Sequence, residues 1–181
     1  MLAAVYHGRR DIRVQEWPAP PDPPAGWVTV AITYCGICGT DIHEYLHGPI
    51  VVPTTPHSLT GAKAPLVLGH EGAGVVVAAG AGAGIDPGTR VGLENSVGCG
   101  HCAACLSGNR QLCPQLAVMP SLSHAMNDDY IPAIELLRRG KVDFESLITD
   151  RVPLQGAVDR GFEPLVADPE SHLKVLIDCR Q

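Results

Sequence analysis

Aromatic residues and basic charge are both scarce in this chain of 181 residues. Phe, Trp and Tyr make up 4% of it, and 13 Lys and Arg against 19 Asp and Glu give a formal net charge of −6. A net negative chain offers no strong electrostatic attraction to nucleic acid or to an anionic membrane, so we expect neither as a partner. A hydrophobic content of 45% and a charged content of 18% argue against a disordered chain.

Long apolar runs are missing as well. The uncharged stretch at residues 72–85 has only 14 residues, and five of them are glycines, so it is too short and too glycine-rich to span a bilayer. The opening MLAAVYHGRR turns polar too early for a secretory signal peptide. We therefore expect a cytoplasmic protein, in which cysteines stay reduced.

A dinucleotide-binding fingerprint is also absent. The glycine run at residues 80–84 lacks the G-x-G-x-x-G spacing, and the turn signal Asp86-Pro87-Gly88 follows it instead of a helix. This pattern indicates a loop between strands, and no site for NAD(P) is expected in the chain.

The remaining pattern favours a mainly β fold with a few helices, of the α+β class. The 20 glycines, 16 prolines and few aromatics are typical of many short strands and turns. Val28, Val30 and Ile32 alternate with smaller or polar residues, which predicts a half-buried strand. Further strands are expected at residues 2–6, 11–16, 67–77 (interrupted by His70 and Glu71), 90–94, within 146–153, and at 173–179. Helices are expected from near Thr40, from Asp128 or Asp129 to Gly140, and over 154–166.

Four of the seven cysteines form one cluster in the sequence. Cys99, Cys102, Cys105 and Cys113 have the spacing C-x2-C-x2-C-x7-C, and nearby glycines at 98, 100 and 108 supply tight turns. Short gaps let successive thiolates face one ion, and a longer gap lets a fourth complete a tetrahedron. An iron–sulfur cluster or unrelated thiols are the alternatives, but the spacing differs from common ferredoxin runs. We predict a structural zinc that needs no ligand from His101.

A second set of metal-ligand types lies on two separate segments. Cys38 and the pair His70-Glu71 each sit beside glycines at a predicted strand end. Thiolate, imidazole and carboxylate together could hold a zinc with one position open to water or substrate. Asp41 is placed to accept the other N–H of His70. From the spacing of these three residues alone, the alternative remains that they are ordinary core residues, as isolated Cys and His often are.

The order of the motifs resembles a known family. The segments CGICGTDIHEY and GHEGAGVV, followed by the four-cysteine lobe, closely resemble zinc-dependent medium-chain alcohol dehydrogenases, particularly the butanediol and sorbitol branch. The resemblance covers residues 1 to about 117 and resumes over about 127–179. It implies a GroES-like β-barrel with two zinc ions per chain. It also implies roles for individual residues: catalytic-zinc ligands at Cys38, His70 and Glu71, a proton relay through Thr40 and His43, and structural-zinc ligands at Cys99, Cys102, Cys105 and Cys113.

The resemblance predicts one domain over residues 1–181. Its parts are 1–117, with the zinc lobe at 98–114, a short junction at 118–126, and a C-terminal return segment at 127–181. The family places a nucleotide-binding domain near residues 118–125, and only a few residues stand there in this chain. A zinc ligand that some relatives supply from that domain is missing too, and Glu71 could replace it.

Three functional hypotheses follow. The preferred one is a zinc enzyme of non-redox type, a lyase, dehydratase, isomerase or cyclase, acting on a small carbonyl or hydroxyl metabolite. The second is an alcohol or polyol dehydrogenase, an oxidoreductase whose nucleotide comes from another chain or by another mode. The third is a non-catalytic zinc-binding remnant. We also expect a homo-oligomer, a dimer, that covers the apolar surface the lost domain would expose.

Other residues receive plainer interpretations. Glu44 and Tyr45 follow the relay histidine and are expected near the pocket without a catalytic role. Cys35 and Cys179 are expected to be packed thiols. His47, His57 and His124 are expected to be solvent-exposed or to make ordinary hydrogen bonds.

Overall fold

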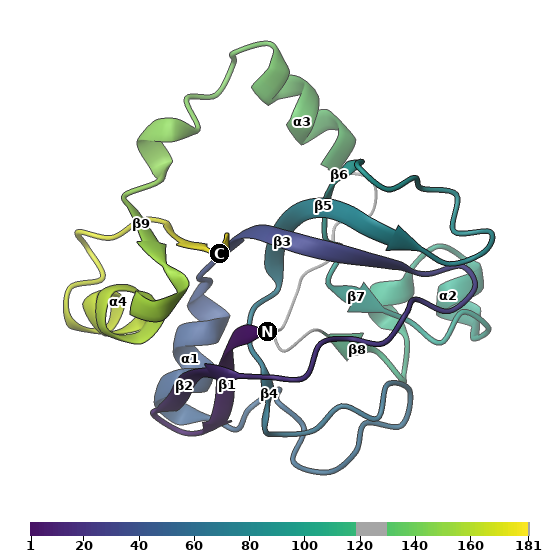
Figure 1. The fold of residues 1–181 in the computed structure, drawn as a ribbon, viewed down its shortest axis with the longest axis horizontal. Coiled ribbons are helices and arrows are strands. Elements are labelled where there is room, and N and C mark those ends of the chain that lie inside the picture. The colour runs from purple at the N-terminus through teal and green to yellow at the C-terminus, as the bar shows by residue number, and fades with distance from the viewer. Residues whose placement is uncertain (119–129, 181) are drawn as a thin grey trace.

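The computed structural model describes residues 1–118 and 130–180, and strands dominate it (Figure 1). The largest sheet has five strands in the order β6-β5-β3-β10-β9. The strands are β3 (Val28–Gly36), β5 (Glu71–Ala79), β6 (Arg90–Gly92), β9 (Asp150–Pro153) and β10 (Val175–Asp178). β10 pairs antiparallel with β3 and parallel with β9, so the expected return segment completes the sheet begun by the first part of the chain.

A second sheet places β1 (Leu2–Gly8) between β2 (Asp11–Glu16) and β4 (Leu66–Val67). The strand expected over 67–77 is therefore two strands in different sheets, and the sequence between them includes His70. The chain leaves this three-stranded sheet through Gly69, whose φ of +118° is a conformation that side chains rarely adopt. The interruption expected at His70 and Glu71 is thus a full break before β5. The strand expected at 90–94 ends at Gly92.

Helices connect and cover the sheets. α1 (Gly39–His47) follows β3 directly, as the sequence predicts from Thr40 onward. α3 (Tyr130–Arg138) ends just before Gly140, which has a φ of +62°. A 3-10 turn (Glu145–Leu147) comes after it. The expected helix over 154–166 is a succession of a 3-10 turn (Leu154–Gly156), a π-helix (Ala157–Phe162) and α4 (Glu163–Ala167). The predicted caps Asp128 and Asp129 and most of the predicted junction 118–126, with His124, lie outside the described residues.

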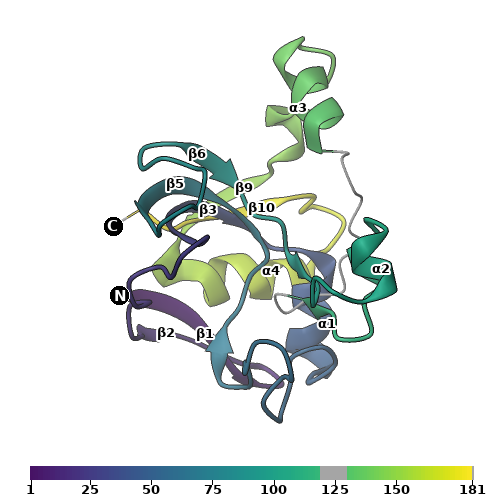
Figure 2. The ribbon, with the colours of Figure 1, turned by 90° about the vertical axis from the view of Figure 1, so that its right-hand side faces the viewer.

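The core lies between the two sheets and the helix of residues 157–167. Figure 2 shows α4 beneath β9 and β10 and above the β1–β2 hairpin. Tyr6, Tyr45 and Phe162 are almost fully buried there together with Val175 and Ile177. Gly161 permits this packing, because a Cβ atom on it would lie 2.9 Å from the Ile37 side chain. This glycine weakens the helix pattern in the sequence but allows close packing in the core.

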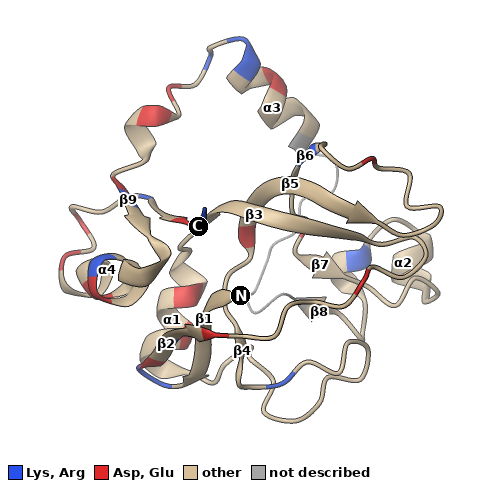
Figure 3. Ribbon diagram, in the orientation of Figure 1, with Lys and Arg blue, Asp and Glu red and all other residues tan. Residues whose placement is uncertain are grey.

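α3 projects away from the sheets in both views, and its Ile131 and Ile134 side chains are exposed (Figures 1 and 2). Lys and Arg are dispersed over separate elements in the part of the chain that the structure describes (Figure 3). Among those residues no helix has the length and apolar character needed to cross a membrane.

Candidate metal centres

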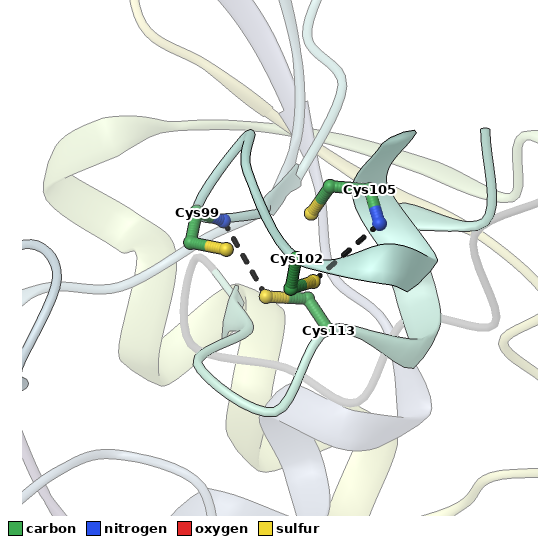
Figure 4. Close-up of side chains that lie close together, drawn as sticks. All are labelled: Cys99, Cys102, Cys105 and Cys113. Carbon is green, nitrogen blue, oxygen red and sulfur yellow. Dashed lines mark hydrogen bonds between the residues drawn. The ribbon is translucent and has the colours of Figure 1, made fainter. Parts of the chain in front are cut away.

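The four clustered cysteines form a small lobe on one side of the five-stranded sheet. β7 (Ser96–Val97) pairs with β8 (Ala117–Val118) at its base, and α2 (Ala103–Leu106) and a 3-10 turn (Arg110–Leu112) form its body. Figure 4 shows the four sulfur atoms turned toward one another, and all lie within 4.8 Å of one another. Four thiol groups at this mutual distance fit a tetrahedral metal ion. All seven cysteines of the chain are free thiols.

Backbone N–H groups in the lobe donate hydrogen bonds to cysteine sulfur atoms, which favours the thiolate form. The Cys99 N–H donates to Cys113 Sγ at 3.4 Å, and the Cys105 N–H donates to Cys102 Sγ at 3.5 Å. A hydrogen bond from the His101 backbone helps to lower the pKa of Cys99 to about 6. Through its side chain, His101 donates to the Cys99 carbonyl, so it stands outside the cluster. Gly98 leaves the necessary space, because a Cβ there would lie 2.7 Å from Cys105 Sγ.

The second centre forms where three segments meet. Cys38 precedes the first turn of α1, His70 ends the break between β4 and β5, and Glu71 begins β5. One ligand atom of each lies within 4.8 Å of the others. The structure thus brings together the three residues that the sequence predicts as ligands of a second zinc ion.

Asp41 connects two of these segments. Its Oδ2 accepts a hydrogen bond from the Cys38 N–H at 2.9 Å, which fixes the start of α1. Its Oδ1 faces His70 Nδ1 at 3.4 Å, where neither atom has a hydrogen-bond partner among the described residues. Both side chains are buried, so leaving these two atoms unpaired costs free energy of folding. A small movement that brings them within hydrogen-bond distance removes this cost. A carboxylate facing the far nitrogen of a histidine is the usual support of a metal-binding imidazole.

The donor set therefore fits a zinc ion. A hydrogen bond with the His70 side chain lowers the pKa of the Cys38 thiol. Burial alone would lower the pKa of His70, but the Asp41 carboxylate and the Cys38 thiol beside it raise this pKa to about 10. Without a metal, Cys38 and His70 favour a thiolate beside an imidazolium. A metal ion that binds there would displace the proton from the imidazole nitrogen.

The two predicted relay residues have different positions. Thr40 lies at the centre, with its Oγ1 at 3.5 Å from His70 Nε2. His43 lies on the next turn of α1 with an exposed ring, and its neighbour is the ring of His47. The structure thus brings Thr40 to the metal ligands and places His43 toward solvent.

Lys174 is a residue of this centre that sequence reasoning missed. It immediately precedes β10, and its Nζ donates to Glu71 Oε2 at 2.7 Å and to the Ile37 carbonyl at 3.3 Å. Gly36 makes room for this arrangement, because a Cβ there would lie 2.2 Å from Glu71 Oε2. The only signal in the sequence is a single lysine within the last predicted strand, at 173–179, and it says nothing about the strand's neighbours.

Glu44 and Tyr45, which are expected near the pocket, are both buried and contact other parts of the fold. The Glu44 carboxylate is buried and accepts hydrogen bonds from the N–H groups of Ile50 and Val51. Tyr45 belongs to the core, with its ring edge against Phe162. Glu44 thus stabilises the loop after α1, and Tyr45 attaches α1 to the helical segment of residues 157–167. Cys35 and Cys179 are partly buried thiols of β3 and of the segment after β10, in agreement with their predicted packing.

Comparison with known proteins places this site in a family. The family model of the alcohol dehydrogenase GroES-like domain matches residues 24–131. A (R,R)-butanediol dehydrogenase of Neisseria gonorrhoeae is 45% identical over 84 residues, which are 45% of this chain and 23% of that protein. The sorbitol dehydrogenase of Bacillus subtilis is 33% identical over 162 residues, 87% of this chain and 41% of that protein. The chain thus matches less than half the length of these relatives.

The fold agrees with a solved relative. The crystal structure of 2R,3R-butanediol dehydrogenase from Bacillus subtilis superposes with a TM-score of 0.83, over 98% of this chain and 99% of that one, at 17% identity. This likeness supports the fold alone. The mainly β architecture is thereby confirmed, and the match to the family model confirms the predicted family. No nucleotide-binding domain is present among the described residues. The chain belongs to the alcohol dehydrogenase GroES-like domain family.

Proposed function

We propose that this chain is a zinc-dependent catalytic unit that interconverts a small alcohol or polyol and its carbonyl form. The observation that carries the proposal is the Cys38, His70 and Glu71 cluster, with the Asp41 carboxylate turned toward the far nitrogen of His70. We propose further that residues 1–117 and 127–181 act as one domain, because β10 inserts between β3 and β9.

Each residue of the centre has a distinct part in this proposal. Cys38, His70 and Glu71 would hold the metal. Asp41 would orient His70 by accepting a hydrogen bond from its Nδ1–H group. When bound, zinc supplies Lewis-acid polarisation of a hydroxyl or carbonyl oxygen. The Thr40 hydroxyl, beside His70 Nε2, would accept the substrate proton and pass it toward His43 at the surface. The four-cysteine lobe would hold a second, structural zinc.

Hydride transfer requires a nucleotide, which another chain or another mode of binding would supply. The names of the relatives, butanediol dehydrogenase and sorbitol dehydrogenase, support this redox chemistry for the centre. The non-redox chemistry preferred from the sequence has no comparable support among them. It remains the second candidate, because the same donor set could promote enolisation of a carbonyl substrate without a nucleotide.

One set of measurements separates the candidates. Metal content is measured in the wild type, in Cys38→Ser and in Cys179→Ser, a matched thiol outside both clusters. Oxidation of butane-2,3-diol and sorbitol is followed with NAD⁺ and with NADP⁺. Solvent deuterium uptake beside the carbonyl of acetoin is followed by NMR without nucleotide.

The outcomes are distinct. Two zinc ions in the wild type, one in Cys38→Ser and nucleotide-dependent oxidation would support the dehydrogenase. Deuterium uptake that needs Cys38 and no nucleotide would support the non-redox enzyme instead. A single zinc that Cys38→Ser does not change would refute both and leave the non-catalytic remnant.

A further inference from the structure

α1 carries a pair of histidines whose spacing and setting differ from those of the other histidines. His43 and His47 are the only two of the eight histidines that stand four positions apart. Their ring centroids are 6.3 Å apart with an interplanar angle of 72°. Both side chains are exposed, and no hydrogen bond to a described residue holds either ring. Residues at this spacing lie on the same face of a helix, so both imidazoles can turn toward one ion.

The residues from His43 to His47 also read H-E-x-x-H, the spacing by which helices of metalloproteases hold a catalytic zinc. In that chemistry the glutamate is the general base and must reach a water on the metal. Here Glu44 is 1% exposed, and its carboxylate accepts from Ile50 N at 2.9 Å and from Val51 N at 2.9 Å. The glutamate is committed to the loop after α1, so this helix can bind a metal there without hydrolysing a peptide.

We propose that His43 and His47 form a surface site for a borderline divalent ion such as Zn²⁺, Ni²⁺ or Cu²⁺, with water completing the coordination. Neutral imidazole suits these ions. The site lies in the last turns of α1, where the partial negative charge of the helix end favours a cation. Arg9 donates to the Leu46 carbonyl at the same end and opposes the ion's charge, so binding is weaker than at the two proposed zinc centres.

The site has a consequence that rests on the proposed function. His43 is the surface end of the proposed proton relay, and an ion on its ring nitrogen would block proton transfer. An excess of such an ion would therefore inhibit turnover by occupying the two histidines, with both zinc centres intact.

The test uses the untagged chain with its zinc bound and free metal removed. Ni²⁺ is titrated by calorimetry, and the zinc content is measured afterwards to exclude exchange. We expect one Ni²⁺ per chain in the wild type and an affinity at least ~10-fold lower in His47→Ala, because one ligand of two is lost. His57→Ala is the matched control, since His57 has no histidine four positions away.

Further readouts keep the test decisive. His47→Gln serves if His47→Ala fails to fold, and Ni²⁺ should selectively broaden the NMR signals of the His43 and His47 rings in the wild type. Absent Ni²⁺ binding, or equal binding in the wild type and His47→Ala, would overturn the site. Binding that leaves turnover unchanged would uphold the site and overturn the relay role of His43 alone.

Discussion

Lys174 and Glu71 form an ion pair at the edge of the second metal centre. Lys174 Nζ lies 2.7 Å from Glu71 Oε2, and the two side chains are 32% and 35% exposed. Lys174 immediately precedes β10, and Glu71 begins β5 on the other side of β3. The cation therefore competes with a metal ion for the same carboxylate.

Replacing Lys174 with methionine should strengthen zinc binding at the second centre. The variant removes a positive charge beside the ligands and frees the Glu71 carboxylate. Exposed ion pairs contribute ~0.2–1 kcal/mol, which corresponds to a roughly 1.4- to 5-fold increase in affinity. Competition with a chelator measures it, and Lys174→Arg should behave as the wild type. Weaker binding in Lys174→Met would show instead that the lysine holds Glu71 in place for the metal.

Asp41→Asn should lower zinc affinity at the second centre by roughly 10–100-fold, the usual cost of losing a carboxylate behind a ligating histidine. It should also lower the free energy of unfolding by about 1–3 kcal/mol. The buried amide oxygen can still accept from the Cys38 N–H, but the NH2 group then replaces the oxygen that faces His70 Nδ1. Metal content and denaturant unfolding measure the two effects. Asp22→Asn, at an exposed position, is the matched control. Unchanged zinc affinity in Asp41→Asn would argue against the support of His70 by Asp41.

Gly36→Ala should weaken the second centre with little effect on the four-cysteine lobe. The new methyl group would lie 2.2 Å from Glu71 Oε2 and would push that carboxylate out of the position in which it lies beside Cys38 and His70. We expect loss of zinc from the second centre alone, measured by metal content. Gly39→Ala is the control, because a Cβ there meets no atom within 4 Å. Full zinc content in Gly36→Ala would mean that the metal does not need Glu71 in its present position.

Cys113→Ser should remove one zinc ion per chain and destabilise the lobe. Cys113 is 6% exposed, and its sulfur accepts hydrogen bonds from the Cys99 and Gln115 N–H groups. Structural zinc binding in small peptides is worth ~10–16 kcal/mol, so its loss should expose the segment around α2 to proteolysis. Limited proteolysis and metal analysis test this. Cys179→Ser should retain the zinc content of the wild type, and equal proteolysis of both variants would contradict a structural zinc.

Two buried tyrosines should make the protein sensitive to alkali. Burial, with Glu44 nearby, raises the pKa of Tyr6 from 10.0 to about 12, and burial with the Glu163 hydrogen bond does the same for Tyr45. Since the folded state holds these protons more tightly, their contribution to stability is complete below pH 10 and is lost as the pH rises toward about 12. Ultraviolet titration should show two tyrosine phenols that ionise at a higher pH than an ordinary tyrosine, and Tyr6→Phe should remove one of them. Titration of every phenol together near pH 10 in the folded protein would contradict this.

The sequence predicts the local parts of this structure well. Alternating Val28, Val30 and Ile32 predict β3, and the cysteine spacing predicts which sulfur atoms meet. Both signals depend on near neighbours in the chain. The break at Gly69 is only partly foreseen. His70 and Glu71 interrupt the apolar pattern there, but only the strand pairing shows that the chain changes sheets.

Long-range contacts account for what the sequence leaves out. Glu44 follows a predicted relay residue, yet its direction is decided by the amides of a loop that reads as irregular. Lys174 reaches the centre only because β10 pairs with β3, a pairing that no periodicity specifies. His43 and His47 are visible in the sequence, but their availability depends on exposure, which spacing does not report.

The place of β10 has a consequence for synthesis. On a ribosome, the segment around Cys38 emerges long before Lys174, which lies 137 positions after its partner Ile37. Until then β3 has one free edge, and the closure of so large a loop is entropically slow. Nascent chains would therefore carry Cys38 and His70 beside an unpaired strand, open to oxidation and to pairing with other chains. Early zinc capture would shield the thiol during this interval and so act as a folding aid before any catalysis.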